Sequence, residues 1–142
     1  METQTAQNSI EKTQWYPHSI DKVWGALTET KHVSKWLAPT NFKGETGAKY
    51  ELHSPKDDCS VVAGVVKEST PYTLVYSWIA LNHKDIETEV KWNLTEENNG
   101  TKVKMIHSGI LKYNKEDAQE MFGSFSNGWK RCFLQIGEVL NN

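Results

Sequence analysis

The chain is poor in cysteine, with two among 142 residues. Cys59 and Cys132 lie far apart and form no CxxC or His/Cys spacing, which excludes a zinc pattern and a disulfide-stapled scaffold. A chain of this length buries enough surface to fold without either kind of crosslink. Free cysteines are typical of reduced compartments, so the sequence predicts a cytoplasmic protein.

Long apolar runs are also missing. No stretch approaches the roughly 18 apolar residues that cross a bilayer, and residues 1–10 lack the apolar segment of a signal peptide. We therefore expect no membrane span and no secretory leader. Because residues 1–8 are polar, we expect a flexible N-terminus there and a single domain over residues 9–142.

Neither sign of charge dominates, and the familiar phosphate and metal motifs are absent. The formal net charge of −2 gives no electrostatic reason to expect nucleic acid or an anionic membrane as partner. There is no glycine-rich phosphate loop and no serine elbow. Four histidines lack the i, i+4 or His-x-Glu spacing of metal ligands and are expected in loops or on polar faces: His18, His32, His53 and His83. The sequence thus predicts neither a metal nor a cofactor.

Aromatic residues are plentiful, with six Trp, five Tyr and four Phe. The tryptophans are spread from Trp15 to Trp129, so they must converge in space if they share one core. Two interpretations remain open. The rings can fill the core as large side chains, or they can wall a cavity for a ligand.

The first third of the chain reads as one strand followed by two short helices. Residues 9–16 carry β-branched and aromatic types, and Pro17 ends this strand because it has no N–H to donate. Residues 20–28 have apolar side chains at the three- and four-residue spacing of an amphipathic helix. A second short helix is expected at about 31–37, with Thr30 as its candidate N-cap.

The middle of the chain alternates between strands and turns. In the last two strands, Trp92, Met105 and His107 fall on a dry face while charged residues fall on the other, as in an antiparallel sheet with one covered side. The segment EENNG at 96–100 predicts a hairpin turn, because Asn-Gly accepts positive φ readily. The expected strands are 48–53, 60–69, 73–80, 86–94 and 102–110.

A long helix is expected at about 115–140, with Asn114 as N-cap. Its apolar residues recur every three or four positions, and its length of about 40 Å is enough to cross a sheet. Gly123 and Gly128 lie inside this segment, where each costs about 1 kcal/mol relative to alanine. Either the helix starts late or bends near them, or they leave room beside the helix for a ligand or a loop.

These elements predict an α+β fold of the helix-grip type. A sheet with one dry face needs a cover, and only the C-terminal helix is long enough to supply it. We expect a curved six-stranded antiparallel sheet wrapped around that helix, with two short helices after the first strand. Such a sheet leaves space beside the helix wherever side chains do not fill it.

Three segments, in their order and spacing, carry a resemblance to a known family: VWGALTE…WL at 23–37, GVVKE…TPYTLVYSW at 64–78, and TKVKMIHSGI at 101–110 ahead of the Gly-Trp at 128–129. Over residues 9–141 the chain resembles the stand-alone domain homologous to the C-terminal part of the activator of the 90-kDa heat-shock protein ATPase. That family lies within the START, polyketide-cyclase and pollen-allergen superfamily of helix-grip folds. The resemblance implies an interior cavity for a lipid-like or aromatic small molecule, and a chaperone as a candidate partner.

His107 is the strongest polar candidate for a site in such a cavity. It can orient a ligand carbonyl or hydroxyl, act as a general base, or be a core histidine bonded to the protein. Tyr50, Tyr76 and Trp78 have polar tips on apolar bodies, which suits either a pocket or simple packing. The predicted cavity residues are Trp36, Tyr50, Tyr76, Trp78, Trp92, Met105, His107, Phe125, Trp129 and Phe133.

Three functions follow from these expectations. The first is binding of a hydrophobic or lipid-like small molecule in an interior cavity that His107 faces, with no catalytic residue assigned. The alternatives are a chaperone ATPase-activator-like interaction module, and a cyclase- or aromatase-type enzyme that uses His107. An exposed strand edge allows either a monomer or a homodimer.

Overall fold

The structure is a computed structural model that describes residues 7–57 and 59–141. Most of the predicted flexible N-terminus, residues 1–6, lies outside the described residues. Asn8 belongs to the folded part, because its backbone carbonyl accepts the N–H of Ile110 at 3.0 Å and its side-chain carbonyl accepts the N–H of Leu111 at 3.1 Å.

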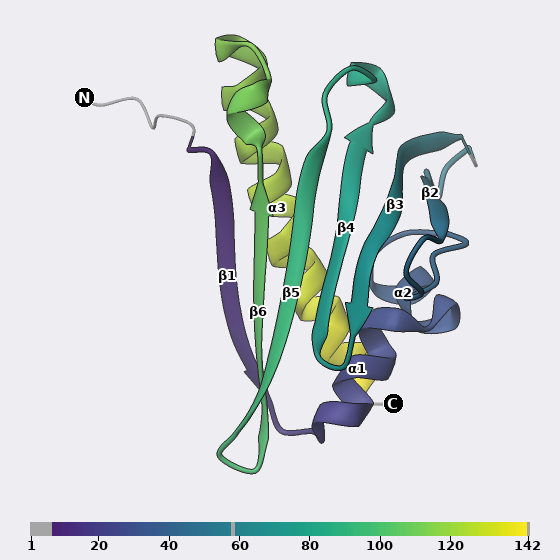
Figure 1. The fold of residues 1–142 in the computed structure, drawn as a ribbon, viewed down its shortest axis with the longest axis vertical. Helices are drawn as coiled ribbons and strands as arrows, with labels where there is room; N and C mark the ends of the chain where they lie inside the picture. The colour runs from purple at the N-terminus through teal and green to yellow at the C-terminus, as the bar shows by residue number, and fades with distance from the viewer. Residues whose placement is uncertain (1–6, 58, 142) are drawn as a thin grey trace.

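The described residues form a six-stranded antiparallel sheet and three α-helices (Figure 1). In chain order the elements are β1 (Ser9–Tyr16), α1 (Ile20–Thr28), α2 (Thr30–Trp36), β2 (Lys49–His53), β3 (Ser60–Thr70), β4 (Thr73–Ala80), the 3-10 turn η1 (Leu81–His83), β5 (Thr88–Glu97), β6 (Gly100–Ser108), the 3-10 turn η2 (Ile110–Lys112) and α3 (Lys115–Leu140). The strand order is β1-β6-β5-β4-β3-β2, so β1 and β2 are the two edges.

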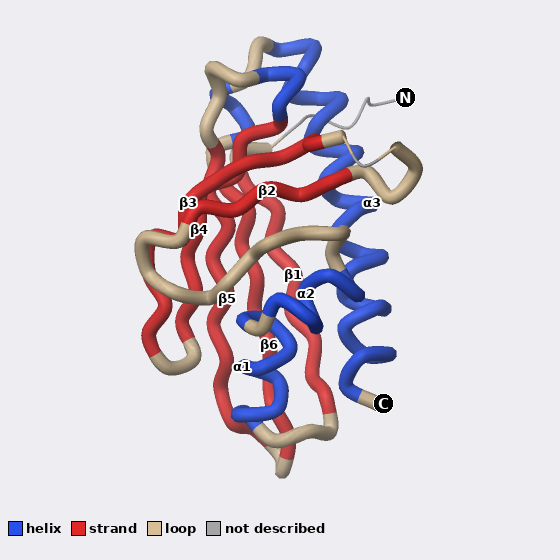
Figure 2. The backbone as a smooth tube through the Cα atoms, turned by 90° about the vertical axis from the view of Figure 1, so that its right-hand side faces the viewer, coloured by secondary structure: helices blue, strands red, loops and turns tan. Residues whose placement is uncertain are grey.

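Helix α3 runs along one face of the sheet, and β2 and β3 curl toward it (Figure 2). The short helices α1 and α2 close the lower part of the same face, and both contact α3. This arrangement confirms the predicted helix-grip fold of α+β class. It also places the buried apolar side chains of the strands mainly between the sheet and α3.

The predicted alternation of β5 and β6 is confirmed. Val90, Trp92, Val103, Met105 and His107 are all fully buried on the helix-facing side. The register with β6 also settles the face of β1, which the sequence left open. Ile10 lies opposite His107 and Lys12 opposite Met105, so the even-numbered residues of β1 face the helix.

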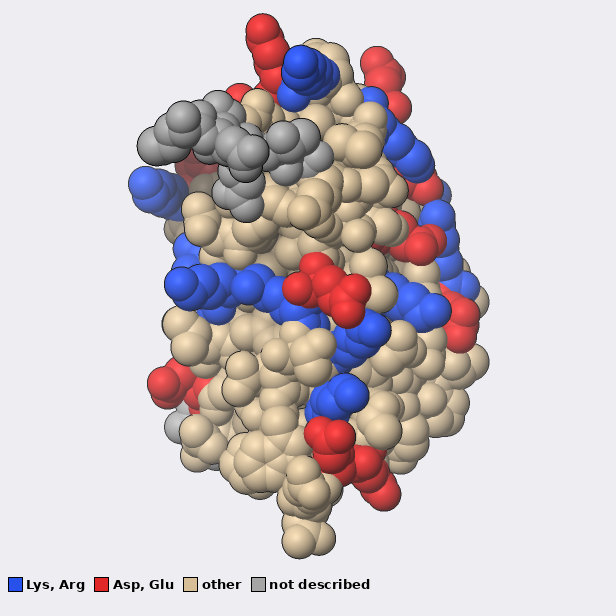
Figure 3. Space-filling model, turned by 90° about the vertical axis from the view of Figure 1, so that its left-hand side faces the viewer, with Lys and Arg blue, Asp and Glu red and all other residues tan. Residues whose placement is uncertain are grey.

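The β1 side of the molecule carries a band of Lys and Arg side chains interrupted by acidic ones (Figure 3). On the outer face, Lys104 pairs with Glu11 at 3.2 Å. On the helix side, Lys12 is half-buried at the open edge of the sheet. A charge pointing inward from an edge strand is a recognised way of blocking further strand pairing.

The hairpin between β5 and β6 forms where the sequence predicts it, but with a different turn. Positive φ falls on Asn98 (49°) and Asn99 (62°), not on Gly100. Asparagine tolerates this conformation better than other non-glycine residues. Gly100 pairs with Glu97, and its lack of a side chain leaves room for the end of β1. A Cβ there would clash with the Tyr16 carbonyl and the Trp15 ring.

Two predictions about helix ends also need correction. Thr30 is the first residue of α2 and not its N-cap, because its hydroxyl donates to the Phe42 carbonyl at 2.6 Å, across the following loop. The late start considered for the last helix is wrong, since α3 begins at Lys115 and continues through both glycines. Its predicted N-cap is confirmed: the Asn114 side chain accepts the N–H of Asp117 at 2.9 Å.

Candidate functional site

The space between the sheet and α3 is occupied mainly by aromatic rings. Trp92 lies at the centre, stacked on Phe133 with centroids 5.5 Å apart, and edge-to-face with Trp36 and Trp129 at 5.6 and 5.8 Å. Trp78 continues the cluster from Trp129, at 5.3 Å. Such contacts stabilise a packed core beyond the burial of their area. The interior is therefore filled by rings where the sequence allowed for a hollow.

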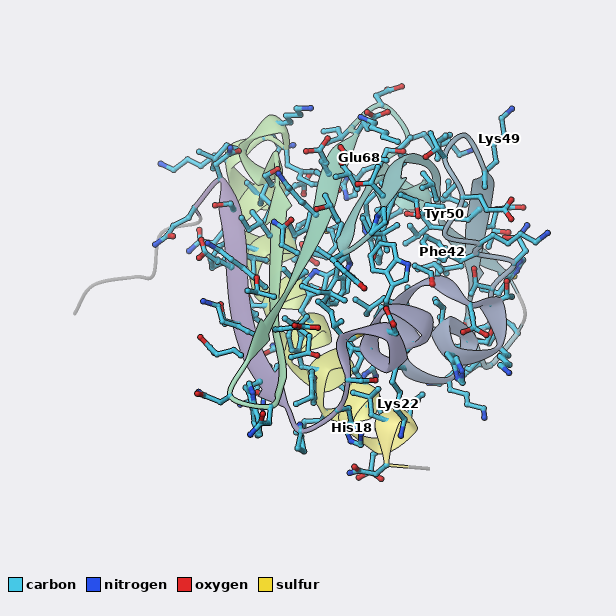
Figure 4. All side chains as sticks on the ribbon, turned by 60° about the horizontal axis from the view of Figure 1, so that its bottom comes forward. His18, Lys22, Phe42, Lys49, Tyr50 and Glu68 are labelled. Atoms are coloured by element: carbon cyan, nitrogen blue, oxygen red, sulfur yellow. The ribbon has the colours of Figure 1, made fainter. Side chains whose placement is uncertain are left out.

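A second ring cluster lies toward the β2 edge. Phe42 and Tyr50 point toward one another (Figure 4), and each meets Tyr76 edge-to-face. The Tyr50 hydroxyl donates to the Ser77 carbonyl at 2.6 Å, passing over Gly64, where a Cβ would meet the Tyr50 ring at 2.7 Å. Burial raises the pKa of Tyr50 well above its ordinary value. This hydroxyl is a neutral structural donor.

His107 is the middle member of a hydrogen-bond chain between α3 and the sheet. The Trp129 indole N–H donates to His107 Nδ1 at 3.0 Å. Since Nδ1 accepts, we assign the ring proton to Nε2, which lies 2.7 Å from the Thr88 hydroxyl. Thr88 in turn donates to the Trp78 carbonyl at 2.9 Å.

Both imidazole nitrogens of His107 are thus held by protein partners, and the ring is fully buried. Burial lowers its pKa from 6.5 to about 3, so the ring is neutral at physiological pH. Phe125 stacks on it with centroids 4.5 Å apart. The geometry matches the core-histidine alternative better than a ligand contact or a general base.

An open pocket of about 330 Å³ lies between the end of α2, the β2–β3 part of the sheet and the middle of α3. We call it the α3 pocket. Three of the ten predicted cavity residues line it, namely Trp78, Phe125 and Trp129. Its full lining is Leu37, Ala38, Leu52, Val61, Val62, Trp78, Ser124, Phe125, Gly128, Trp129, Arg131 and Cys132.

The other predicted cavity residues lie elsewhere. Phe133 lines a groove of about 600 Å³ beside β1, here called the β1 groove, together with Glu11, Lys12, Thr13, Gln14, Tyr16, Lys130, Leu134 and Gly137. Tyr50 lines a hollow that also involves Lys49, Glu51 and Glu87. The remaining five are buried and line none of these three openings of the described chain: Trp36, Tyr76, Trp92, Met105 and His107.

The α3 pocket has a mostly apolar wall with few polar groups. Gly128 leaves it open, because a Cβ there would meet no described atom within 4 Å. Cys132 is buried, and burial raises the pKa of its thiol to about 11, so it is protonated and unreactive at neutral pH. The Trp78 indole N–H has no acceptor among the described residues.

Sequence reasoning missed most of this wall. Leu52, Val62 and Arg131 come from three elements whose approach depends on how the sheet curls, and residue periodicity carries no information about curvature. The one available signal was Gly128, a glycine in mid-helix. The interpretation of room beside the helix agrees with the open space at this residue.

Within residues 7–57 and 59–141, no group of three or more His, Cys, Asp or Glu side chains is arranged to hold a metal ion. No helix in this part of the chain combines the length and the hydropathy of a transmembrane span.

Comparison with known proteins gives a family match and several similar structures. Residues 17–141 match the family model described as "Activator of Hsp90 ATPase homolog 1-like protein". Protein MLL2253 from Mesorhizobium loti superposes with a TM-score of 0.82 at 24% identity, covering 94% of this chain and 96% of that one. A comparison with curated proteins finds no match.

Two further structures have the same fold. PFC0360w, an HSP90 activator from Plasmodium falciparum, has a TM-score of 0.78 at 22% identity, with 94% of this chain and 96% of that one covered. The Aha1 dimer from Colwellia psychrerythraea has a TM-score of 0.76 at 17% identity and the same coverage. At these identities the likeness shows the fold.

Proposed function

The chain belongs to the family of Activator of Hsp90 ATPase homolog 1-like proteins, and we propose that within this fold it serves as a binding protein for a hydrophobic or lipid-like small molecule. The proposed site is the α3 pocket, with Trp78, Phe125 and Trp129 as its aromatic wall. No reaction is part of this proposal, because His107, the imidazole in contact with the aromatic wall, is neutral and has protein partners on both nitrogens.

The pocket itself is the observation that supports this function. Its volume of about 330 Å³ falls at the lower end of the range for small-molecule sites, roughly 300–1,000 Å³. Apolar side chains from the sheet, from the segment after α2 and from α3 surround it. A mid-helix glycine, Gly128, keeps it open although glycine weakens a helix.

The test is to fill the pocket from its helix side. Gly128→Leu places a side chain in the open space, and Gly123→Leu is the matched control, because Gly123 lies in the same helix with equally open surroundings and does not line the pocket. Trp78 and Trp129 make intrinsic fluorescence a direct readout. The probes form a panel of a medium-chain fatty acid, a sterol and a flavonoid, and we expect at least one of them to bind. Its affinity should fall by about tenfold or more in Gly128→Leu and stay unchanged in Gly123→Leu.

Circular dichroism spectra of both variants check that the helix is intact. The proposal fails if no member of the panel binds, or if the binder is held equally well by the wild-type chain and by folded Gly128→Leu.

A second candidate is activation of a chaperone ATPase through protein–protein contact. The family match and the fold shared with PFC0360w, an HSP90 activator, favour it. The check is ATP hydrolysis by a 90-kDa heat-shock protein with and without this chain. Stimulation that Gly128→Leu leaves unchanged would assign the activity to a surface other than the α3 pocket, and a flat response would remove this candidate.

A further inference from the structure

We propose that the ligand of the α3 pocket is an organic anion, a molecule with an apolar body and one anionic head group. The inference rests on the proposed function and deepens it from a hydrophobic ligand to a charged amphiphile. It depends on which polar groups the pocket presents and on whether they already have partners.

The charge of the pocket is positive. Arg131 is its one charged residue among the described residues, and no carboxylate belongs to the lining. Within residues 7–57 and 59–141, Arg131 forms no ion pair, unlike Lys67, which bridges Glu87 and Glu89. Its charge also acts on the pocket wall, because it opposes the rise that burial causes in the pKa of Cys132. An anionic group would therefore find an available guanidinium at this site.

The second polar feature is an unused donor. Trp78 is 7% exposed, and its indole N–H lacks an acceptor in the described chain. The neighbouring indoles of Trp36 and Trp129 both have one, the Ala26 carbonyl and the His107 ring. An indole N–H can only donate, so it requires an acceptor atom, and the oxygens of an anionic head group are acceptors. The guanidinium of Arg131 and the indole N–H of Trp78 thus favour the same ligand chemistry.

Arg131 is exposed, whereas the Trp78 nitrogen is covered by its surroundings. A ligand oxygen reaches that nitrogen only if a wall side chain shifts. Phe125 is half-buried, its ring centroid lies 6.2 Å from that of Trp78, and it lines the pocket, so it is the side chain placed to move. The inference therefore includes a small displacement of Phe125 on binding.

The first experiment compares head groups on one apolar body. Decanoate, decyl phosphate and 1-decanol are titrated below their micellar concentrations against the wild-type chain, Arg131→Gln and Lys130→Gln. Lys130 is the matched control, because it is the adjacent exposed cation and lines the β1 groove instead. We expect an anionic amphiphile to bind about fivefold or more tightly than 1-decanol, with this preference lost only in Arg131→Gln.

Decanoate and decyl phosphate distinguish a carboxylate from a phosphate head, and tighter binding of either supports the inference. Equal affinities for all three probes, with binding still blocked by Gly128→Leu, would overturn the anion inference and leave the proposed function standing. A preference for the anion that persists in Arg131→Gln would also overturn it. Absence of binding by all three decyl probes would overturn the anion inference, and the proposed function would then stand or fall with the sterol and the flavonoid of its own panel.

The second experiment follows the indole N–H groups by ¹H–¹⁵N NMR, with the Trp78 resonance assigned from Trp78→Phe. The preferred anion should move the Trp78 resonance downfield as the N–H gains an acceptor. The Trp15 indole, already bonded to the Glu97 carbonyl at 2.7 Å, is the internal control and should stay in place. A bound anion that leaves the Trp78 resonance unmoved would contradict the role given to this donor.

Discussion

His107 shows how a titratable side chain can be buried with protein partners on both ring nitrogens. Its partners come from α3 and β5, and the chain of bonds continues to the backbone of β4. Each donor in this series of hydrogen bonds meets one acceptor. The buried polar groups that form the series are therefore satisfied while the imidazole stays neutral. Adding a proton would place a charge among Trp78, Phe125 and Trp129.

We predict a loss of stability in mild acid that depends on this one residue. The pKa of His107 is about 3 in the folded state against 6.5 as the reference, so the unfolded chain binds the extra proton between these values. The free energy of unfolding should therefore have its full contribution from neutral His107 above about pH 6.5. It should fall as the pH drops toward about 3. Urea unfolding at about pH 7 and about pH 5 should show a loss of about 2 kcal/mol from this residue.

His107→Gln is the informative variant, because its amide keeps an acceptor and a donor but does not titrate. It should be less stable than the wild-type chain at neutral pH and should lose less stability on acidification. His18→Gln, at a histidine that bonds the Asn141 side chain, should keep the wild-type response. Equal acid responses in all three chains would argue against a neutral buried imidazole.

At the scale of the elements, glycines have opposite effects in the sheet and in α3. Gly64 in β3 lets the Tyr50 side chain reach β4, because a Cβ at this position would collide with the Tyr50 ring. The same Cβ would also collide with the Ser77 carbonyl. Gly123 in α3 has no described atom within 4 Å of where a Cβ would lie. The first glycine is required by packing, whereas the second only weakens its helix.

We predict opposite signs for alanine at these two positions. Gly64→Ala should lower the free energy of unfolding by roughly 1–3 kcal/mol through overpacking. Gly123→Ala should raise it by about 1 kcal/mol through helix propensity. Chemical unfolding of both variants measures the pair, and a stabilised Gly64→Ala would show that β3 can move away from Tyr50.

The sequence was most informative where one element determines the pattern alone. The alternation in β5 and β6 and the spacing in α3 identified the dry face, and Asn114 was recognised as a cap. It was less informative where two segments meet. Thr30 bonds a loop carbonyl twelve residues away, and Gly100 is required by the Trp15 side chain of another strand.

The candidate site shows the same limit. Periodicity placed Trp78, Phe125 and Trp129 on the inner face, as it placed Trp92 and Met105. Which of them border open space depends on the curl of β2 and β3 toward α3, and that curvature arises from the assembled sheet. The ring-filled core and the pocket beside it therefore could not be told apart from sequence.

On the scale of the whole molecule, β1 is one of the two open edges of the sheet, where a second copy could add a strand. The β1 groove behind it contains Phe133 and Leu134, the latter 69% exposed. Lys12 points into the same groove from the edge strand. A second copy adding its own strand here would have to accommodate that ammonium group, so we expect Lys12 to oppose strand pairing at this edge.

Replacing this charge should promote association. Lys12→Ile puts an apolar side chain in its place in the wall of the groove. Size-exclusion chromatography with light scattering should give a larger mean mass for this variant than for the wild-type chain at the same concentration. Lys102→Ile is the control, because it makes the same exchange on the opposite face of the sheet, at a residue that does not line the β1 groove. Equal association of both variants would indicate nonspecific hydrophobic association. A Lys12→Ile variant that does not associate would contradict the role of Lys12.

Strand β1 pairs along its whole length with β6, from Ser9 opposite Ser108 to Tyr16 opposite Thr101. During synthesis the ribosome makes β1 as the first strand and its partner as the last strand, with the two residues of the outer pair 99 positions apart. At about 5–20 residues per second, β1 waits on the order of 5–20 s before β6 exists. The nascent chain must therefore keep the unpaired backbone of β1 from pairing with other strands for that interval.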